Sequence, residues 1–326
     1  MSMSHRRRMG AAKQEGIALL TILVMVALAT ILAASIAKRQ SNTAEGTAYL
    51  MRQNQSLLYA KSAEVFFAEL LKDDAENAGD VDFLQENWAK PMPAFPVDDG
   101  YVSGVLEDQS GKFNLNSLLK ADGTVNENSK KWFEKILVKA GLPAQLSEAA
   151  IDWQDVDDEQ TGSMGAESGY YRGLQNASMP PNARFHDVEE LKQLRGFEDG
   201  KYKLIAPYVS ALPSNETTVN INTAPAFILA SIDEKLDAHA VQQLLDKKNA
   251  ALEKFNNAAE LWEAEPFTSV SAENKAIVGD LLGVKSNYFK AKIEIELSGR
   301  KRQFTSELVR KDKEVYVAYR SMAPFN

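Results

Sequence analysis

Six carboxylate side chains gather in one short stretch of the sequence, and no basic residue lies among them. Glycines at positions 162, 165 and 169 give this stretch the backbone freedom of a loop. Oxygen ligands on a flexible loop are what Ca²⁺ requires, so calcium binding is one chemistry that the pattern allows, and a solvated acidic loop is the other. The six residues are Asp152, Asp155, Asp157, Asp158, Glu159 and Glu167.

The spacing of these carboxylates is not that of an EF-hand, although Asp155 and Asp157 begin like one. No glycine stands at the sixth place of such a loop, and Ala166 occupies the twelfth, where an EF-hand has a glutamate. The residues alone therefore leave the ligand set open.

Nucleophilic or acid–base catalysis has little support in the sequence. Of the three histidines, His5 lies in a basic leader, while His186 and His239 stand singly near predicted helical segments. No G-x-S-x-G, P-loop, H-E-x-x-H or dinucleotide glycine motif is present. The sequence therefore predicts a protein that is not an enzyme.

The segment 219–232, VNINTAPAFILASI, resembles the first half of a helix-hairpin-helix unit. DNA-binding versions offer the backbone N–H groups of a glycine-rich hairpin to phosphate, but acidic residues follow here, namely Asp233, Glu234 and Asp237. The whole chain has a formal charge of −8, which also disfavours a nucleic-acid partner. We interpret the segment as a protein-packing module.

The composition is that of a folded chain with a sizeable core. The chain has 326 residues, of which 44% are apolar, and no internal repeat or low-complexity tract is apparent. There is no cysteine, so disulfides cannot brace the loops. Any brace must come from packing or from a metal ion.

The elements that position these residues begin with an uncharged apolar run from Ile17 to Ala37. As a helix it would cover roughly 30 Å, which matches the hydrocarbon thickness of a bilayer. Four basic residues precede it, so the positive-inside rule places the leader in the cytoplasm and the body across the membrane. A cleaved secretory signal is the alternative, but the run is long for one and ends without a clear A-x-A site.

No helix-breaking residue follows soon, so the helix is predicted to run from Ile17 to Lys72, half in lipid and half outside. Its outer half carries an apolar stripe that should pack against a globular body. The stretch 73–100 is rich in proline and glycine and is predicted to be a loop or linker with one short helix near Phe83. The stripe consists of Tyr59, Ala63, Phe66, Phe67 and Leu70.

Four strands are predicted, and together with the long helix they form a small α+β layer pair. The segment 288–297 alternates apolar and charged residues, as in a half-buried antiparallel strand. The other strands cover 101–109, 302–310 and the region from Val315 to Tyr319.

Between residues 113 and 285 the pattern changes to helices. One predicted helix presents Trp132 and Phe133 on a buried face and is stopped by Gly141. A capping box at Asp187 to Glu190 opens another, which buries Leu191 and Leu194. Further helices are predicted after Pro225, through Val241 and Leu244, and through Leu261 and Trp262.

The junction of leader and apolar run, Lys13-Gln14-Glu15-Gly16 followed by Ile17, resembles a type IV prepilin signal. The resemblance implies that a prepilin peptidase cleaves between Gly16 and Ile17 and methylates the new amino group of Ile17. Most pilins have glutamate at the fifth mature position, where it pairs with the N-terminal amine of the subunit ahead; here that position is Thr21. A subunit with nothing ahead of it has no amine to pair, so threonine fits the tip of a filament.

Other segments, at 108–116, 152–171, 185–191 and 219–224, resemble the K-type minor pseudopilin of type II secretion, the general secretion pathway protein K family. This resemblance implies a type IV pilin-like α+β fold, a long N-terminal helix packed on an antiparallel sheet, with a large inserted all-α domain. It also implies structural calcium in that domain and a tip complex with the I-type and J-type pseudopilins. The ligands implied by matching residues are Asp155, Asp157 and Glu167, followed by Asp158 and Glu159; many relatives have an acidic residue where Ser168 stands.

The domain prediction that follows has five parts. They are a prepilin leader at 1–16, a transmembrane helix at 17–38, the outer half of the long helix with linker and first strand at 39–112, an inserted helical domain at 113–285, and C-terminal strands at 286–326.

The predicted function is that of a non-enzymatic minor pseudopilin at the tip of the type II secretion pseudopilus, single-pass in the inner membrane with its body in the periplasm. It would initiate or cap assembly with its partner pseudopilins. Two alternatives stay open: a minor pilin at a type IV pilus tip, and a membrane-anchored calcium-dependent binding module or hydrolase.

Overall fold

The computed structural model describes residues 15–77 and 79–322. The chain divides into two compact units, Met1–Leu58 and Tyr59–Asn326. Of the predicted leader, residues 1–14 lie outside the described residues. The second unit holds both the sheet and the helical segment. The finer division into five parts stays a prediction.

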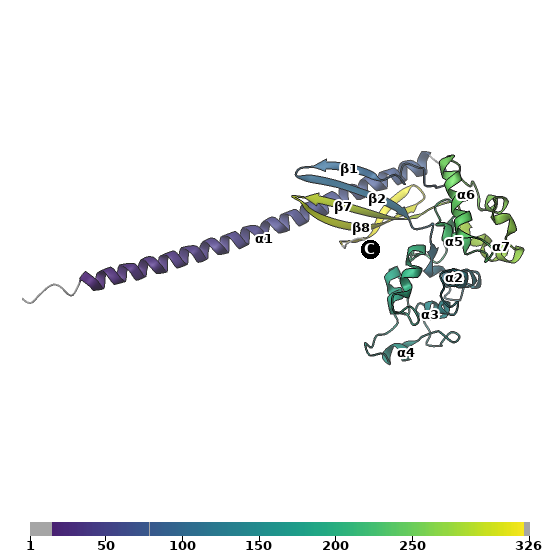
Figure 1. Cartoon of the computed structure of the whole chain (residues 1–326), viewed down its shortest axis with the longest axis horizontal. Helices are drawn as coiled ribbons and strands as arrows, with labels where there is room; N and C mark the ends of the chain where they lie inside the picture. The colour runs from purple at the N-terminus through teal and green to yellow at the C-terminus, as the bar shows by residue number, and fades with distance from the viewer. Residues whose placement is uncertain (1–14, 78, 323–326) are drawn as a thin grey trace, which may run out of the picture. The chain divides into compact units, whose positions relative to one another are not determined.

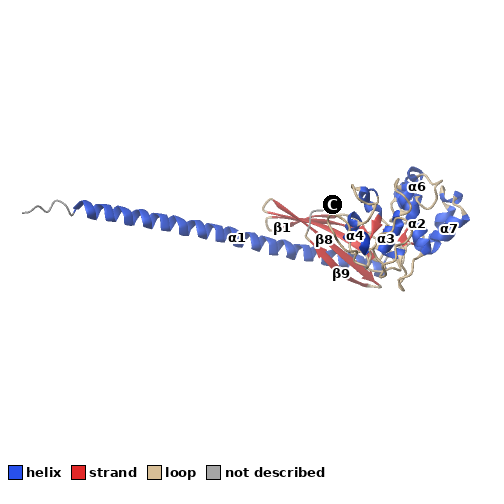
Figure 2. Cartoon of the chain, turned by 90° about the horizontal axis from the view of Figure 1, so that it is seen from below, coloured by secondary structure: helices blue, strands red, loops and turns tan. Residues whose placement is uncertain are grey.

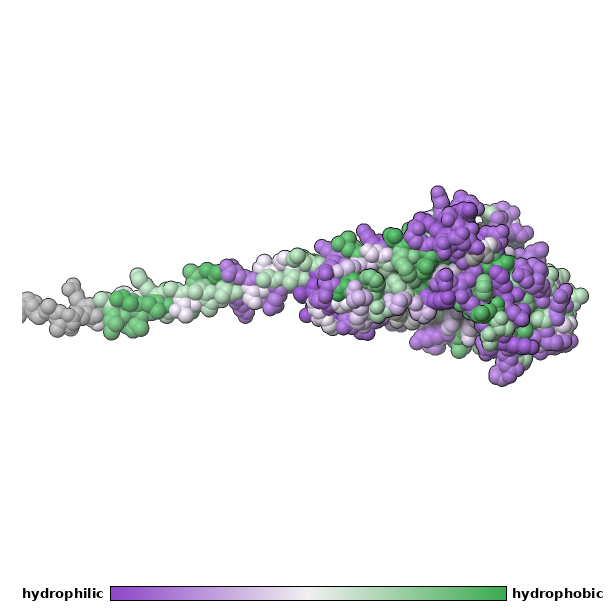
Figure 3. All heavy atoms as spheres, turned by 90° about the horizontal axis from the view of Figure 1, so that it is seen from above, coloured by the Kyte–Doolittle hydropathy of each residue, from purple (hydrophilic) through white to green (hydrophobic). Residues whose placement is uncertain are grey.

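The first unit contains the N-terminal part of helix α1 (Glu15–Asn77), which begins before Ile17 and ends beyond the predicted Lys72. Large apolar side chains from Ile17 to Ile36 are exposed along the start of this helix, and Figure 3 shows them on the face in view. By length and composition, α1 is the described helix that could cross a membrane. The hydroxyl of Thr21 donates to the carbonyl oxygen of Ala18 at 2.9 Å, so the polar group is satisfied within the helix.

In the second unit, the C-terminal part of α1 packs on the sheet through a narrower stripe than the sequence suggested. The predicted stripe was partly wrong, because Phe66 is 44% exposed and Leu70 only half-buried. The buried positions recur at three- and four-residue spacing, which keeps them on one helix face. They are Ala60, Ala63, Phe67 and Leu71.

The sheet has five antiparallel strands in the order β1-β2-β7-β8-β9 (Figure 2). Every second residue of the β7 strand is buried, as the alternation in the sequence predicted. The bounds are β1 (Met92–Val97), β2 (Gly100–Asp108), β7 (Tyr288–Leu297), β8 (Arg300–Lys311) and β9 (Glu314–Ser321).

Strand β1 corrects the prediction of a linker at 73–100. Its two prolines, Pro93 and Pro96, are tolerated because β1 is an edge strand that pairs only with β2. The short helix expected near Phe83 is also absent from the described chain, where residues 84–89 form turns.

Between β2 and β7 the chain forms a segment of short helices around one apolar core (Figure 1). The predicted stop at Gly141 is confirmed by its left-handed φ of 77°. The predicted capping box at Asp187 is also present, but the helix that it opens is a 3₁₀ helix, as is the one through Leu261. The helix after Pro225 is only five residues long.

This segment contains an internal repeat, which the sequence pattern did not reveal. Asn116 exchanges two hydrogen bonds with the backbone of Phe185, at 2.9 and 2.8 Å. Asn222 does the same with Phe255, at 3.0 and 2.8 Å. We call each arrangement an asparagine hook.

The two copies also agree at their ends. Each begins with a two-residue strand that pairs in parallel with the strand ending the same copy. We name residues 113–210 repeat 1 and residues 219–283 repeat 2. Repeat 1 contains β3 (Phe113–Asn114), η1 (Leu115–Leu118), α2 (Glu127–Lys139), α3 (Leu146–Asp152), α4 (Ser168–Arg172), η2 (Val188–Gln193), η3 (Lys201–Leu204), η4 (Ala206–Tyr208) and β4 (Val209–Ser210); repeat 2 contains β5 (Val219–Asn220), α5 (Ala226–Ala230), α6 (Ala238–Ala250), η5 (Ala258–Glu263), η6 (Phe267–Ser269), α7 (Ala272–Val278), η7 (Gly279–Leu281) and β6 (Leu282–Gly283).

A buried hydrogen-bond network joins the helical segment to the sheet where the chain leaves β2 and enters β7. One carboxylate oxygen of Asp108 accepts hydrogen bonds from the hydroxyls of Thr223, at 2.5 Å, and Ser286. The hydroxyl of Ser110 accepts from the backbone N–H of Asn287 at 3.1 Å. Both chain crossings are therefore fastened to each other and to repeat 2.

Candidate metal centre

The candidate metal centre is built on the end of helix α3, whose last residue is Asp152. That residue is fully buried, and its two carboxylate oxygens accept from the backbone N–H of Thr161 at 3.1 and 3.2 Å. The contact folds the acidic stretch back over the helix end. We call residues 153–167 the acidic loop.

Folding of the loop brings three carboxylates together: Asp152, Asp155 and Glu167 each place an oxygen within 4.8 Å of the others. Glu167 is only 7% exposed, yet neither of its carboxylate oxygens has a hydrogen-bond partner in the described chain. One oxygen of Asp155 is equally buried and unpaired. Buried acceptors without donors are rare in folded proteins. Here the unpaired carboxylates of Asp155 and Glu167 also lie beside a third carboxylate, that of Asp152.

The electrostatics of the cluster are unfavourable without a cation. The pKa of Asp155 is raised to about 7, mainly by burial and in part by the neighbouring charges of Asp152 and Asp157. Burial likewise raises the pKa of Glu167 to about 7, with the other carboxylates adding to the effect. No basic side chain among the described residues contributes to either shift. The arrangement of hard, buried oxygens suits a divalent cation such as Ca²⁺.

The sequence-predicted ligands therefore separate into two groups. Asp155 and Glu167 lie in the cluster, and Asp152, which the ligand prediction left out, lies with them. Asp157 and Asp158 are exposed neighbours: one oxygen of Asp157 accepts from the N–H of Glu159, and one of Asp158 from that of Ser168. Glu159 is exposed as well.

Two residues of repeat 1 that lie outside the acidic loop hold the loop against the rest of the repeat. Glu148, one turn before Asp152 on α3, accepts from the N–H of Met164 at 2.7 Å. Arg195 donates from Nη1 to the carbonyl oxygen of Gly165 at 2.9 Å. Sequence reasoning missed both residues, because neither lies in the acidic stretch and only the folded loop brings them to it.

A second group of three carboxylates has a different environment. Asp74, Asp82 and Glu86 lie close together, and Arg310 pairs with Asp74 at 2.8 Å and also with Asp82. Burial and the charge of Glu86 raise the pKa of Asp74 to about 7, while Arg310 opposes the rise. In this cluster a guanidinium supplies the positive charge.

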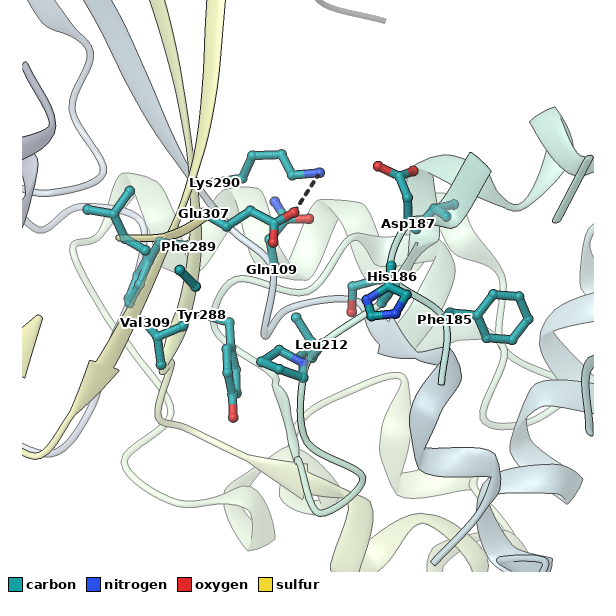
Figure 4. A pocket seen from close by; sticks show the side chains of 16 residues that line it. Gln109, Phe185, His186, Asp187, Leu212, Tyr288, Phe289, Lys290, Glu307 and Val309 are labelled. Carbon is teal, nitrogen blue, oxygen red and sulfur yellow. Dashed lines mark ion pairs between the residues drawn. The ribbon is translucent and has the colours of Figure 1, made fainter. Parts of the chain in front are cut away.

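A pocket of about 130 Å³ lies between repeat 1 and the sheet (Figure 4). His186 and Asp187 line one side of the pocket, and Lys290 of β7 and Glu307 of β8 face them. The Nζ atom of Lys290 lies 3.9 Å from Oε1 of Glu307. The hydroxyl of Ser210, which also lines the pocket, is buried without a hydrogen bond, so it is not joined to the His186 imidazole. The pocket thus lacks the nucleophile and base pairing of a hydrolase.

The predicted processing and assembly residues lie on α1 in the first unit. Gly16 and Ile17 are both within the helix and exposed, as is Thr21. Cleavage between Gly16 and Ile17 stays a prediction.

Comparisons with known proteins converge on one family. Two families described as "Type II secretion system (T2SS), protein K" match residues 111–214 and 219–285, a division that coincides with the two repeats. The chain is 32% identical over 321 residues to Type II secretion system protein K of Pseudomonas aeruginosa, covering 95% of this chain and 93% of the relative. It is 30% identical to the protein of the same name from Aeromonas hydrophila, over 91% of this chain and 93% of that one.

A solved structure supports the fold. A chain of the crystal structure of the GspK-GspI-GspJ complex from the enterotoxigenic Escherichia coli Type 2 Secretion System matches with a TM-score of 0.76. The match covers 86% of this chain and 99% of that one, at 22% sequence identity. The α+β fold with a long N-terminal helix and an antiparallel sheet is therefore confirmed.

Proposed function

The chain belongs to the type II secretion system protein K family and is a minor pseudopilin of that system; on this premise we propose that it lies at the tip of the pseudopilus. The residue that supports the tip position is Thr21, which stands where most pilins have a glutamate. Its hydroxyl is already bonded within α1 and needs no charged partner from a subunit ahead. The amine of Ile17 would receive the glutamate of the next subunit.

We further propose that the chain is cleaved between Gly16 and Ile17 by a prepilin peptidase and methylated at Ile17. The apolar part of α1 would then hold it in the inner membrane, with the second unit in the periplasm. The basic residues before the helix and the uncharged run from Ile17 to Ala37 support this orientation.

Calcium is the proposed structural ion of repeat 1. The observation that carries this proposal is the set of buried, unpaired oxygens on Asp155 and Glu167, which face Asp152; no basic side chain among the described residues contributes to the pKa shifts of either residue. The cluster at Asp74, Asp82 and Glu86 is the contrast, because Arg310 already neutralises part of its charge. A cluster without such a partner needs either protons or a metal ion.

Asp152, Asp155 and Glu167 would hold the ion, with Asp157 and Asp158 adding negative charge nearby. When bound, Ca²⁺ supplies the positive charge that lets three buried carboxylates stay ionised together. The same binding would fasten the end of α3 to the start of α4, because Asp152 ends one helix and Glu167 precedes the other.

The proposed partners are the I-type and J-type minor pseudopilins, since the neighbouring structure is a complex of three such proteins. A non-enzymatic role fits both the family and the pocket, in which the described Ser210 and His186 are not coupled. A hydrolase would need such a coupling, and a type IV minor pilin would assemble with pilus subunits instead.

Mass spectrometry of the mature protein tests the proposal. We expect an N-terminal methylated Ile17, together with I-type and J-type pseudopilins in a pull-down from membranes. An intact Met1, or a cut beyond Ala37, would contradict the pilin processing. Recovery of type IV pilus subunits alone would favour the alternative filament.

A further inference from the structure

We propose that Arg195 is a positioning residue for the calcium centre: it holds the chain on both sides of Glu167 and so keeps that carboxylate beside Asp152 and Asp155. The inference rests on the proposed calcium binding and concerns how the site is formed before the ion arrives. Arg195 lies outside the acidic loop, just after η2.

The contacts of Arg195 bracket Glu167. On the N-terminal side, its Nη1 donates to the carbonyl oxygen of Gly165 at 2.9 Å. On the C-terminal side, its guanidinium carbon lies 5.1 Å from the ring centroid of Tyr170 in helix α4. Glu167 itself has extended backbone and precedes α4, so anchors on either side restrict where its side chain can point.

The peptide at Gly165, to which Arg195 donates, lies directly against Asp152, one of the candidate ligands. A Cβ atom at Gly165 would lie only 2.3 Å from an oxygen of Asp152 and 2.3 Å from the carbonyl oxygen of Thr161. Only glycine permits so close an approach of this peptide to the carboxylate. The hydrogen bond from Arg195 to Gly165 therefore acts on a backbone segment that touches the cluster.

Arg195 performs this role without neutralising the cluster. Among the described residues it forms no ion pair with Asp152, Asp155 or Glu167, and its guanidinium is taken up by a carbonyl and an aromatic ring. Arg310 in the other cluster behaves oppositely, pairing with two carboxylates. The negative charge that would attract Ca²⁺ is thus left in place.

Repeat 2 shows that the scaffold does not require an arginine here. The position equivalent to Arg195 is Glu265, because Arg195 follows Leu191 at the same spacing as Glu265 follows Leu261, and both leucines are fully buried. Glu265 accepts a hydrogen bond from the hydroxyl of Thr268, at 2.5 Å. The arginine therefore occurs in the copy that carries the acidic loop.

Calcium titration of the full chain in detergent micelles tests the proposal, with melting in excess chelator as a second readout. Arg195→Ala should weaken calcium binding about tenfold, the usual effect of losing an outer-shell partner. Arg195→Lys retains a donor and the charge, and should recover most of the affinity. Arg184→Ala is the matched control, since Arg184 also donates to a carbonyl in the described chain, that of Pro213 at 2.8 Å, away from the cluster.

Equal calcium affinity in wild type and Arg195→Ala would overturn the positioning role, as would an equal loss in Arg184→Ala. If Arg195→Ala does not fold, Arg195→Gln takes its place, with a several-fold loss expected and an unchanged affinity contradicting the proposal. A wild-type chain that takes up no calcium would overturn the calcium centre itself, so failure of the two proposals can be told apart.

Discussion

Repeats 1 and 2 close in the same way, by an asparagine that hooks the backbone of a phenylalanine, but the chain between the second helix and that phenylalanine differs. Repeat 2 crosses this distance with residues 251–254, whereas repeat 1 inserts the acidic loop, α4 and the turns that follow. Positions that agree between the copies serve the scaffold. Features found in one copy only, namely the carboxylate cluster and Arg195, call for a functional explanation.

The largest effect is expected where the repeats agree, at the asparagine hooks. Asn116→Ala and Asn222→Ala each leave a buried backbone N–H and C=O of a phenylalanine unpaired, so we expect each to lower the free energy of unfolding by about 3 kcal/mol. Urea unfolding measures the change, with the exposed Asn176→Ala as the control. If the free energy of unfolding falls no more in either variant than in the control, the hooks do not hold the repeats together.

The next effect separates the repeats through calcium. At a calcium concentration of 100 times Kd, the free energy of unfolding of the wild type should rise by about 2.7 kcal/mol over its value in chelator. Glu167→Gln should abolish the rise, because it removes a charged ligand from the buried cluster. In chelator the same variant should be at least as stable as wild type, since it relieves repulsion among three carboxylates. An undiminished rise in Glu167→Gln would contradict the site.

A pH effect of about 2 kcal/mol is expected from the other cluster, at Asp74. Burial raises the pKa of Asp74 to about 7 from 3.8, so the folded chain binds a proton there that the unfolded chain releases. Stability from this group therefore increases as pH falls from about 8 toward 5 and is lost as pH rises through 7. Urea unfolding at several pH values in chelator should show this slope, and Asp74→Asn should reduce it. An unchanged slope in the variant would refute the assignment.

The smallest effect sharpens the division among the predicted ligands. Asp157→Asn should weaken calcium binding only a few-fold, because Asp157 contributes a nearby charge and is exposed. Glu159→Gln should leave the affinity unchanged, since its side chain is exposed and does not contribute to the shifts of Asp155 or Glu167. Loss of binding in Glu159→Gln would place the ion elsewhere on the loop.

Local patterns were enough to predict much of the fold. The apolar run of α1, the alternation of β7, the stop at Gly141 and the capping box at Asp187 each depend on neighbouring residues, and each is present. Strand β1 was missed because prolines usually argue against a strand, and only its place at the sheet edge removes that objection.

The features missed at the site depend on long-range contacts. The repeat was hidden because Asn116 and Asn222 find their phenylalanines across intervening segments of different length. Asp152 was visible as part of the acidic stretch, but its burial at the end of α3 follows from the folded loop. Arg195 and Glu148 carry no pattern that links them to the loop, so only the structure identifies them.

Native mass spectrometry of the full chain released from detergent micelles tests the central claim most directly. We predict that the wild type retains calcium, that Glu167→Gln loses it, and that Glu86→Gln in the arginine-paired cluster retains it. Retention of the same calcium content by Glu167→Gln, or a wild type free of calcium under saturating conditions, would contradict the assignment of repeat 1 as the metal-binding copy.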